Sequence, residues 1–133
     1  AVVSSTDDET MARMEELVEF LDIDHLIDEP AGNLSTGQKK LLNIASTLLR
    51  DPDVVLLDEP TAGVNPGLIN DITDAILDLN ERGSTFFVVE HDMDVVRKIA
   101  DYSYVFANGT NLVDGKPTEV LQDERVLKAY FGE

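Results

Sequence analysis

The chain has 133 residues, 43% of them hydrophobic, and its 27 acidic residues outweigh 10 basic ones to give a formal net charge of −17. No apolar run reaches the roughly 18 residues of a membrane span, the N-terminal AVVSSTDDE does not resemble a signal peptide, and the lack of cysteine excludes disulfides and thiolate metal sites. So acidic a surface repels nucleic acids and anionic lipids, and we expect one soluble, cytoplasmic domain.

The first part of the chain predicts two core-facing helices. Residues 10–21 place one stripe of apolar side chains along a helix: Met11, Met14, Leu17, Val18 and Leu21. A second helix is expected over 39–50, with Ser35 or Thr36 as N-cap candidates and Pro52 beyond its end. It begins at a glycine-containing polar turn.

Two apolar segments that follow are typical of a parallel sheet. Residues 54–57 are apolar without alternation, which predicts a strand covered on both faces. Asn65 is expected to cap, and Pro66 to begin, a helix that ends at Gly83. Residues 85–90 then predict a second buried strand, so the order is strand, helix, strand.

The last part predicts short elements. A helix is expected over 93–100, followed by strands over 102–107 and 111–113. The Asn108-Gly109 dipeptide between these strands favours a hairpin. Two short helices complete the chain, over 119–122 and 126–130. The predicted fold class is therefore α/β, with a mostly parallel sheet and flanking helices.

Polar side chains are expected where the two parallel strands end. Asp58 and Glu59 follow the first strand, at the edge where open α/β sheets bind ligands. A carboxylate there can hold Mg²⁺ through water, and its neighbour can orient a water for attack on a phosphate. His91 follows the second strand and could donate a hydrogen bond to a phosphoryl oxygen. His25 has no partner motif and is expected to be structural.

The polar turn, residues 35–38, is a candidate anion site. Ser35, Thr36, Gly37 and Gln38 offer a hydroxyl and N–H groups at a helix N-terminus, where the helix dipole favours a phosphate. Plainer interpretations exist, because Ser and Asn are common helix caps and Asp-Glu-Pro is a common polar turn. The features occur together and in order, which favours the functional interpretation.

Together these motifs resemble those of ABC ATPases. Residues 34–38 (LSTGQ) resemble the signature motif, 54–60 (VVLLDEP) the Walker B strand with its catalytic glutamate, 62–66 (AGVNP) the D-loop and 89–91 (VEH) the switch histidine. The resemblance covers nearly the whole chain. Within the family, AGVNP and the final AYFGE look most like ATPase subunits of branched-chain amino-acid importers.

This resemblance implies ligands, partners and roles. Two ATPase subunits of the family sandwich two ATP molecules and act on transmembrane permease subunits at the inner face of the cell membrane. The residues that would contact ATP are Ser35, Thr36, Gly37, Gln38 and Asn65. Asp58 would hold Mg²⁺, Glu59 would polarise the attacking water and His91 would touch the γ-phosphate. We expect the polar turn and the carboxylates to project from opposite ends of one rigid block.

Some features depart from the family pattern. Thr36 stands where the family usually has Gly, which matters if that position needs positive φ, and Asn65 replaces the commoner Asp. The phosphate-binding loop G-x-x-x-x-G-K-[ST] does not occur in the 133 residues. The chain is therefore identified as the C-terminal half of a nucleotide-binding domain, lacking the strand of that loop. Its predicted parts are a signature-bearing helical part, 1–52, and the remaining motifs, 53–133.

In the family's fold, the missing strand lies between the strands at 85–90 and 102–107, so both are expected to have an unpaired apolar edge. We expect an ATP-hydrolysing subunit of an importer for branched-chain amino acids or similar polar solutes, inactive as this chain alone. The alternatives are a non-catalytic docking or regulatory half-domain, and an ABC-type ATPase of DNA repair, which the acidity disfavours. The acidity itself reflects either a solvated surface without a role or adaptation to a salt-rich cytoplasm.

Overall fold

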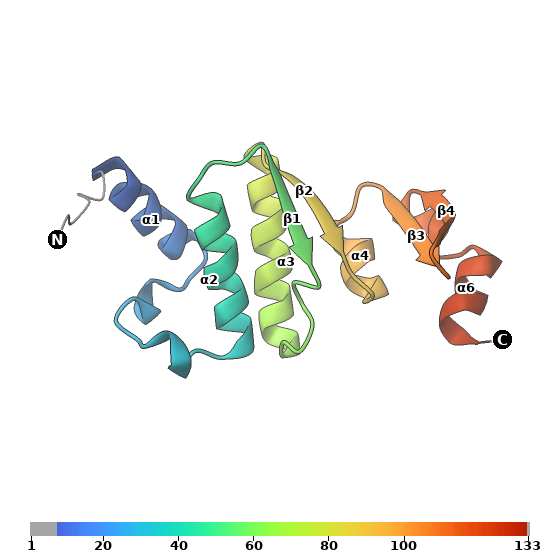
Figure 1. The fold of residues 1–133 in the computed structure, drawn as a ribbon, viewed down its shortest axis with the longest axis horizontal. Helices are drawn as coiled ribbons and strands as arrows, with labels where there is room; N and C mark the ends of the chain where they lie inside the picture. The colour runs from blue at the N-terminus through green and yellow to red at the C-terminus, as the bar shows by residue number, and fades with distance from the viewer. Residues whose placement is uncertain (1–7, 133) are drawn as a thin grey trace. The chain divides into compact units, whose positions relative to one another are not determined.

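The computed structural model describes residues 8–132 (Figure 1), with the side chain of residue 131 excepted. Residues 1–7, most of the segment tested above for a signal peptide, and Glu133, the end of AYFGE, lie outside the described residues. The chain forms two compact units, of which the first ends at Val89 and the second begins at Glu90. In the described part, none of the helices has the length and apolar character needed to cross a membrane.

The first unit combines helices with a pair of parallel strands. Leu56 of one strand lies opposite Phe87 of the other. The helices pack in sequence, the first against the second and the second against the third, and the third contacts the second strand. In chain order the elements are α1 (Asp8–Phe20), the 3-10 turns η1 (Asp24–Leu26) and η2 (Ala31–Asn33), α2 (Thr36–Leu48), β1 (Val54–Asp58), α3 (Pro66–Glu81) and β2 (Thr85–Val89).

The core of this unit lies between its helices and one face of the strand pair. Ile72 of α3 is fully buried and Val55 of β1 is 1% exposed. Other buried side chains come from every helix of the unit: Val18, Leu41, Ile44, Leu48, Ile76 and Leu79. The predicted helices are confirmed, although the second begins at Thr36 and not at 39, because Ser35 caps it.

The expectation that β1 is covered on both faces is wrong. Leu56 is 74% exposed, whereas Val55 next to it is buried. Alternate residues of the two strands share one face, and the described helices of this unit cover only the other. The exposed side chains Val54, Leu56, Phe87 and Val89 form what we call the bare sheet face.

The second unit is built around an antiparallel hairpin. Its two strands join through Asn108 and Gly109, which both have positive φ, as the predicted turn requires. Its small core contains Val105, Val120 and Val126. The elements are α4 (Met93–Ile99), β3 (Ser103–Ala107), β4 (Thr110–Gly115), α5 (Pro117–Val120) and α6 (Glu124–Phe131).

The strands form two separate sheets. β1 pairs only with β2, and β3 only with β4, among the residues described. β2 and β3 therefore each keep an unpaired edge, as expected for each of these strands. The side chains of Tyr102, Tyr104 and Phe106 beside or on β3 are also largely exposed.

Candidate functional site

The polar turn is closed by a capping box. Ser35 is the N-cap of α2, and its Oγ accepts a hydrogen bond from the Gln38 amide at 3.2 Å. The Ser35 amide in turn donates to Oε1 of Gln38 at 2.9 Å. The predicted cap is confirmed. Because Oγ is the acceptor in this arrangement, the hydroxyl proton of Ser35 can still be donated to a ligand.

Thr36 and Gly37, the other two residues of the turn, differ in what their positions require. Thr36 is the first residue of α2 and does not have positive φ, so its position does not require glycine. Gly37 is buried, and a Cβ there would lie 2.0 Å from Cδ2 of Leu68 and 3.0 Å from Cγ1 of Val64. Any side chain at position 37 would therefore have to displace the end of the Leu68 side chain, a packing constraint that sequence reasoning missed.

The two carboxylates lie at the C-terminal end of the parallel strand pair. Asp58 is the last residue of β1, opposite Val89, and both Asp58 and Glu59 are exposed. These carboxylate oxygens are donors of the kind that Mg²⁺ prefers. Glu59 has φ of 46°, in the left-handed region, which costs a non-glycine residue about 1–2 kcal/mol.

Several backbone contacts hold this strained residue. The Glu59 amide donates to the Val89 carbonyl at 2.8 Å, and the Glu59 carbonyl accepts from the Ala62 amide at 3.2 Å. The ammonium group of Lys40 also donates to the Glu59 carbonyl. The end of β1 is therefore tied both to β2 and to α2.

The polar turn and the carboxylates do not lie at opposite ends of a block, contrary to the expectation above. Figure 1 shows that α2 begins, and β1 ends, at the same end of the first unit. The contact between Lys40 and Glu59 agrees with this placement. The reason is that the connection at residues 49–53 reverses the chain, so that α2 and β1 run in opposite directions.

Asn65 and His91 occupy element boundaries. Asn65 is the N-cap of α3, and its Oδ1 accepts a hydrogen bond from the Leu68 amide at 3.0 Å, so the predicted cap is confirmed. His91 is exposed and precedes Asp92, the N-cap of α4, in the second unit. The His91 amide donates to Oε2 of Glu90 at 3.1 Å.

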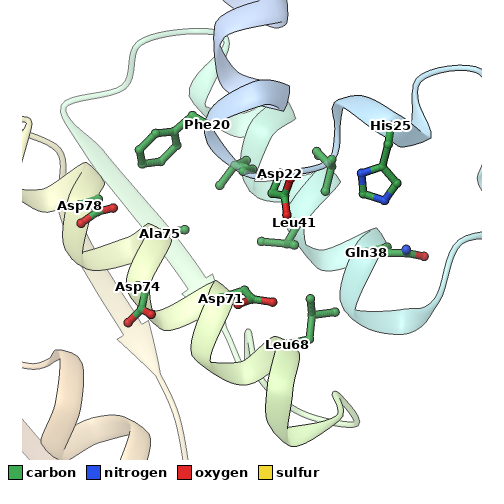
Figure 2. A pocket seen from close by; sticks show the side chains of 12 residues that line it. Phe20, Asp22, His25, Gln38, Leu41, Leu68, Asp71, Asp74, Ala75 and Asp78 are labelled. Atoms are coloured by element: carbon green, nitrogen blue, oxygen red, sulfur yellow. The ribbon is translucent and has the colours of Figure 1, made fainter.

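A pocket of about 410 Å³ lies beside the polar turn, between the end of α1, α2 and α3 (Figure 2). Figure 2 shows Gln38 at one side and a row of α3 carboxylates, Asp71, Asp74 and Asp78, at another. His25 also lines the pocket, and its ring lies within 4.8 Å of carboxylate oxygens of Asp22 and Asp24. These acidic neighbours of His25 are also close to it in the sequence, three and one residues before it.

Comparisons with known proteins find a family model and several transport ATP-binding proteins that the chain resembles. Residues 2–97 match the family model described as "AAA domain, putative AbiEii toxin, Type IV TA system". The probable branched-chain amino acid transport ATP-binding proteins LivG of Archaeoglobus fulgidus and of Methanocaldococcus jannaschii are 39% and 40% identical to the chain. These matches cover 95% and 96% of the chain, but 49% and 51% of the relatives.

A relative with a different transport role and a solved structure complete the comparison. The lipopolysaccharide export system ATP-binding protein LptB of Escherichia coli is 36% identical over 91% of the chain and 50% of its own length. The ADP conformation of MJ1267, an ATP-binding cassette of an ABC transporter, superposes with a TM-score of 0.85 at 40% identity. That match covers 94% of the chain and 51% of MJ1267. The chain thus spans about half the length of the proteins that it matches.

Proposed function

The chain belongs to the ABC family of transporter ATP-binding proteins, and from this membership we propose that it supplies the signature motif and the catalytic carboxylates of an ATPase subunit. It corresponds to the C-terminal half of that subunit's nucleotide-binding domain. Residues 1–52 are proposed as the signature-bearing helical part and 53–133 as the part with the Walker B strand, D-loop and switch histidine.

One observation carries the proposal. Glu59 stands directly after a parallel strand, in a left-handed backbone conformation that β2 and α2 both hold, with its residue exposed to solvent. Uncommon backbone conformations of this kind persist where the surroundings enforce them, and they cluster at functional sites. We assign Glu59 the role of orienting the attacking water and accepting its proton.

The other site residues take roles that fit their positions. Asp58, the exposed carboxylate at the strand end, would hold Mg²⁺, which when bound neutralises charge on phosphate oxygens. Ser35 can donate its hydroxyl proton to a phosphate, and the amides at the start of α2 favour an anion. We assign Thr36, Gly37, Gln38 and Asn65 to the same ATP contact, and His91 to the γ-phosphate.

For the whole protein we propose an importer of branched-chain amino acids or similar polar solutes, because two of the relatives are named as branched-chain amino acid transport ATP-binding proteins. The proposed partners are a second ATPase subunit and transmembrane permease subunits, through which the protein would lie at the inner face of the cell membrane. LptB shows that similar sequences occur in another transport system, so the solute rests on the LivG likeness alone.

We expect this chain alone to be inactive because its 133 residues lack the phosphate-binding loop, and we propose that the bare sheet face is where the other half of the domain binds. The side chains of this face include Leu56 and Phe87, 74% and 54% exposed, and apolar strand faces of this kind are normally covered. We propose that the other half of the nucleotide-binding domain covers them and brings the phosphate-binding loop, on which most of the affinity for triphosphate depends.

The test is ATP hydrolysis by the 133-residue chain alone and after refolding with the N-terminal half of the M. jannaschii relative. We expect no turnover from the chain alone and magnesium-dependent turnover from the combined halves. In the combined halves, Glu59→Gln should abolish turnover and leave ATP binding intact. Hydrolysis that survives Glu59→Gln would refute the role assigned to Glu59.

The bare sheet face also favours a second candidate, a docking half-domain without catalysis. Under this alternative the two halves associate and bind ATP, but no hydrolysis appears in any variant. A DNA-repair ATPase has no comparable support, since a net charge of −17 opposes binding to a polyanion.

A further inference from the structure

Lys40 connects α2, near its start, to the backbone of Glu59. It lies in the second turn of α2, is half-buried, and donates a hydrogen bond from its ammonium group to the Glu59 carbonyl. That carbonyl also accepts from Ala62, and the Glu59 amide donates to Val89. The backbone of Glu59 is therefore held from three directions: by β2, by its own turn and by a side chain of α2.

The conformation so held is one that glutamate disfavours. In the described part of the chain, the other non-glycine residues with positive φ are Asp22, Asp51 and Asn108. Asp and Asn tolerate this region because their short polar side chains bond to the local backbone, whereas Glu has no such advantage. Contacts from outside the turn are therefore needed most at Glu59, and Lys40 makes one of them.

We propose that Lys40 is a positioning residue, which fixes the direction in which the Glu59 side chain leaves the backbone and couples that direction to the polar turn. Its consequence for hydrolysis rests on the function proposed above. The coupling has a short physical path. The helix that carries Lys40 begins with the Ser35–Gln38 capping box, and Gly37 packs directly against Leu68.

A displacement of the polar turn would therefore be transmitted to the Glu59 backbone through the first two turns of α2 and the Lys40 side chain. A ligand that displaces the start of α2 also displaces the ammonium group that holds the Glu59 carbonyl. Lys39 provides a matched comparison, since it is the adjacent lysine, carries the same charge and is exposed. Removing its charge changes the local potential in a similar way without removing the bond to Glu59.

The first experiment uses the 133-residue chain and measures the ¹³C shift of the Glu59 carbonyl and the φ-dependent coupling of its amide. In Lys40→Met we expect an upfield shift of this carbonyl carbon and a coupling that leaves the left-handed value. Lys40→Arg should restore both, and Lys39→Met should change neither. A Glu59 carbonyl shift that is the same in Lys40→Met as in the native chain would overturn the proposal.

The second experiment measures ATP hydrolysis by the chain combined with the N-terminal half of the M. jannaschii relative. Lys40→Met should lower kcat about 10-fold or more while KM for ATP changes less than about 2-fold, because a misplaced catalytic group slows chemistry more than binding. Lys40→Arg should recover most of the loss. An unchanged kcat in Lys40→Met would overturn the coupling. If the native combination hydrolyses no ATP, the proposed function fails, whereas the carbonyl shift still decides the positioning role.

Discussion

The Cβ atom that Gly37 lacks would lie 2.0 Å from Cδ2 of Leu68. A side chain at position 37 would therefore force the Leu68 side chain at the start of α3 to move. The polar turn and the start of α3 are distant in the sequence, and this contact holds them together. Both carry residues of the candidate site.

Gly37→Ala is therefore expected to destabilise the first unit by about 1 kcal/mol, the low end of the usual cost of overpacking, because the Leu68 side chain is half-buried and can turn aside. The backbone conformation of residue 37 is helical, so steric overlap with Leu68 and not strain is the cause. Urea denaturation measures the change. In Gly37→Ala/Leu68→Ala the two losses should be less than additive. Full additivity would show that the two positions do not meet.

Substitution of Asn65 tests whether a residue that we assign to ATP contact also stabilises the fold as a helix cap. Asn65→Ala should lower stability by about 1 kcal/mol, because the Leu68 amide loses its capping acceptor. Asn65→Asp should retain the native stability, since aspartate is an equally good cap and its charge suits a helix N-terminus. Thermal unfolding of the three proteins distinguishes them. Equal stability of Asn65→Ala and the native chain would mean that the cap contributes nothing.

The sequence predicted the features that local signals determine. Ser35 and Asn65 were identifiable as caps because cap preferences depend on residue type and immediate context. The hairpin at Asn108-Gly109 and the parallel order of β1, α3 and β2 were predictable for similar reasons. The carboxylates were placed correctly at a strand end because strand direction follows from the strand–helix–strand order.

The features that depend on distant neighbours could not be predicted in the same way. The apolar residues at 54–57 indicate that other elements pack against this strand, but not on which face they pack. Leu56 is exposed because the helices of the first unit pack only against the opposite face. The meeting of Lys40 with Glu59 depends on the reversal of the chain at 49–53. The positive φ of Glu59 has no sequence signal, since glutamate rarely adopts it.

Asp123 should show a pH response that can be measured in the chain alone. Hydrogen bonds from Arg125, first from its side chain and then from its amide, lower the pKa of Asp123 to about 2 from the usual 3.8. Because the folded-state pKa is the lower one, this carboxylate's stabilising effect is fully present above 3.8 and is lost as pH falls through about 2. Carboxyl ¹³C titration should give the lowered value, and Arg125→Met should raise it toward 3.8. An unshifted pKa in the native chain would contradict these bonds.

The acidic surface should make stability depend on salt. With a net charge of −17, the folded chain repels itself, and the screening length falls from about 10 Å at 0.1 M to about 3 Å at 1 M salt. The melting temperature should therefore rise from low salt to molar KCl. Asp71→Asn/Asp78→Asn, which removes two charges from the α3 row beside Asp74, should raise the melting temperature at low salt and reduce its salt dependence. A melting temperature independent of KCl would exclude salt adaptation as the meaning of this composition.

Leu56→Asp provides the most direct test of what covers the bare sheet face. Leu56 is 74% exposed in this chain, so its replacement should change the stability of the chain alone by less than about 0.5 kcal/mol. The same change should prevent association with the N-terminal half of the M. jannaschii relative, because a charge would then be buried without a partner. Ile27→Asp is the matched control, since Ile27 is 57% exposed but does not belong to the bare sheet face. Calorimetric titration of each variant with the N-terminal half measures the affinity. If Leu56→Asp and Ile27→Asp bound equally well, the bare sheet face would not be the surface that joins the two halves.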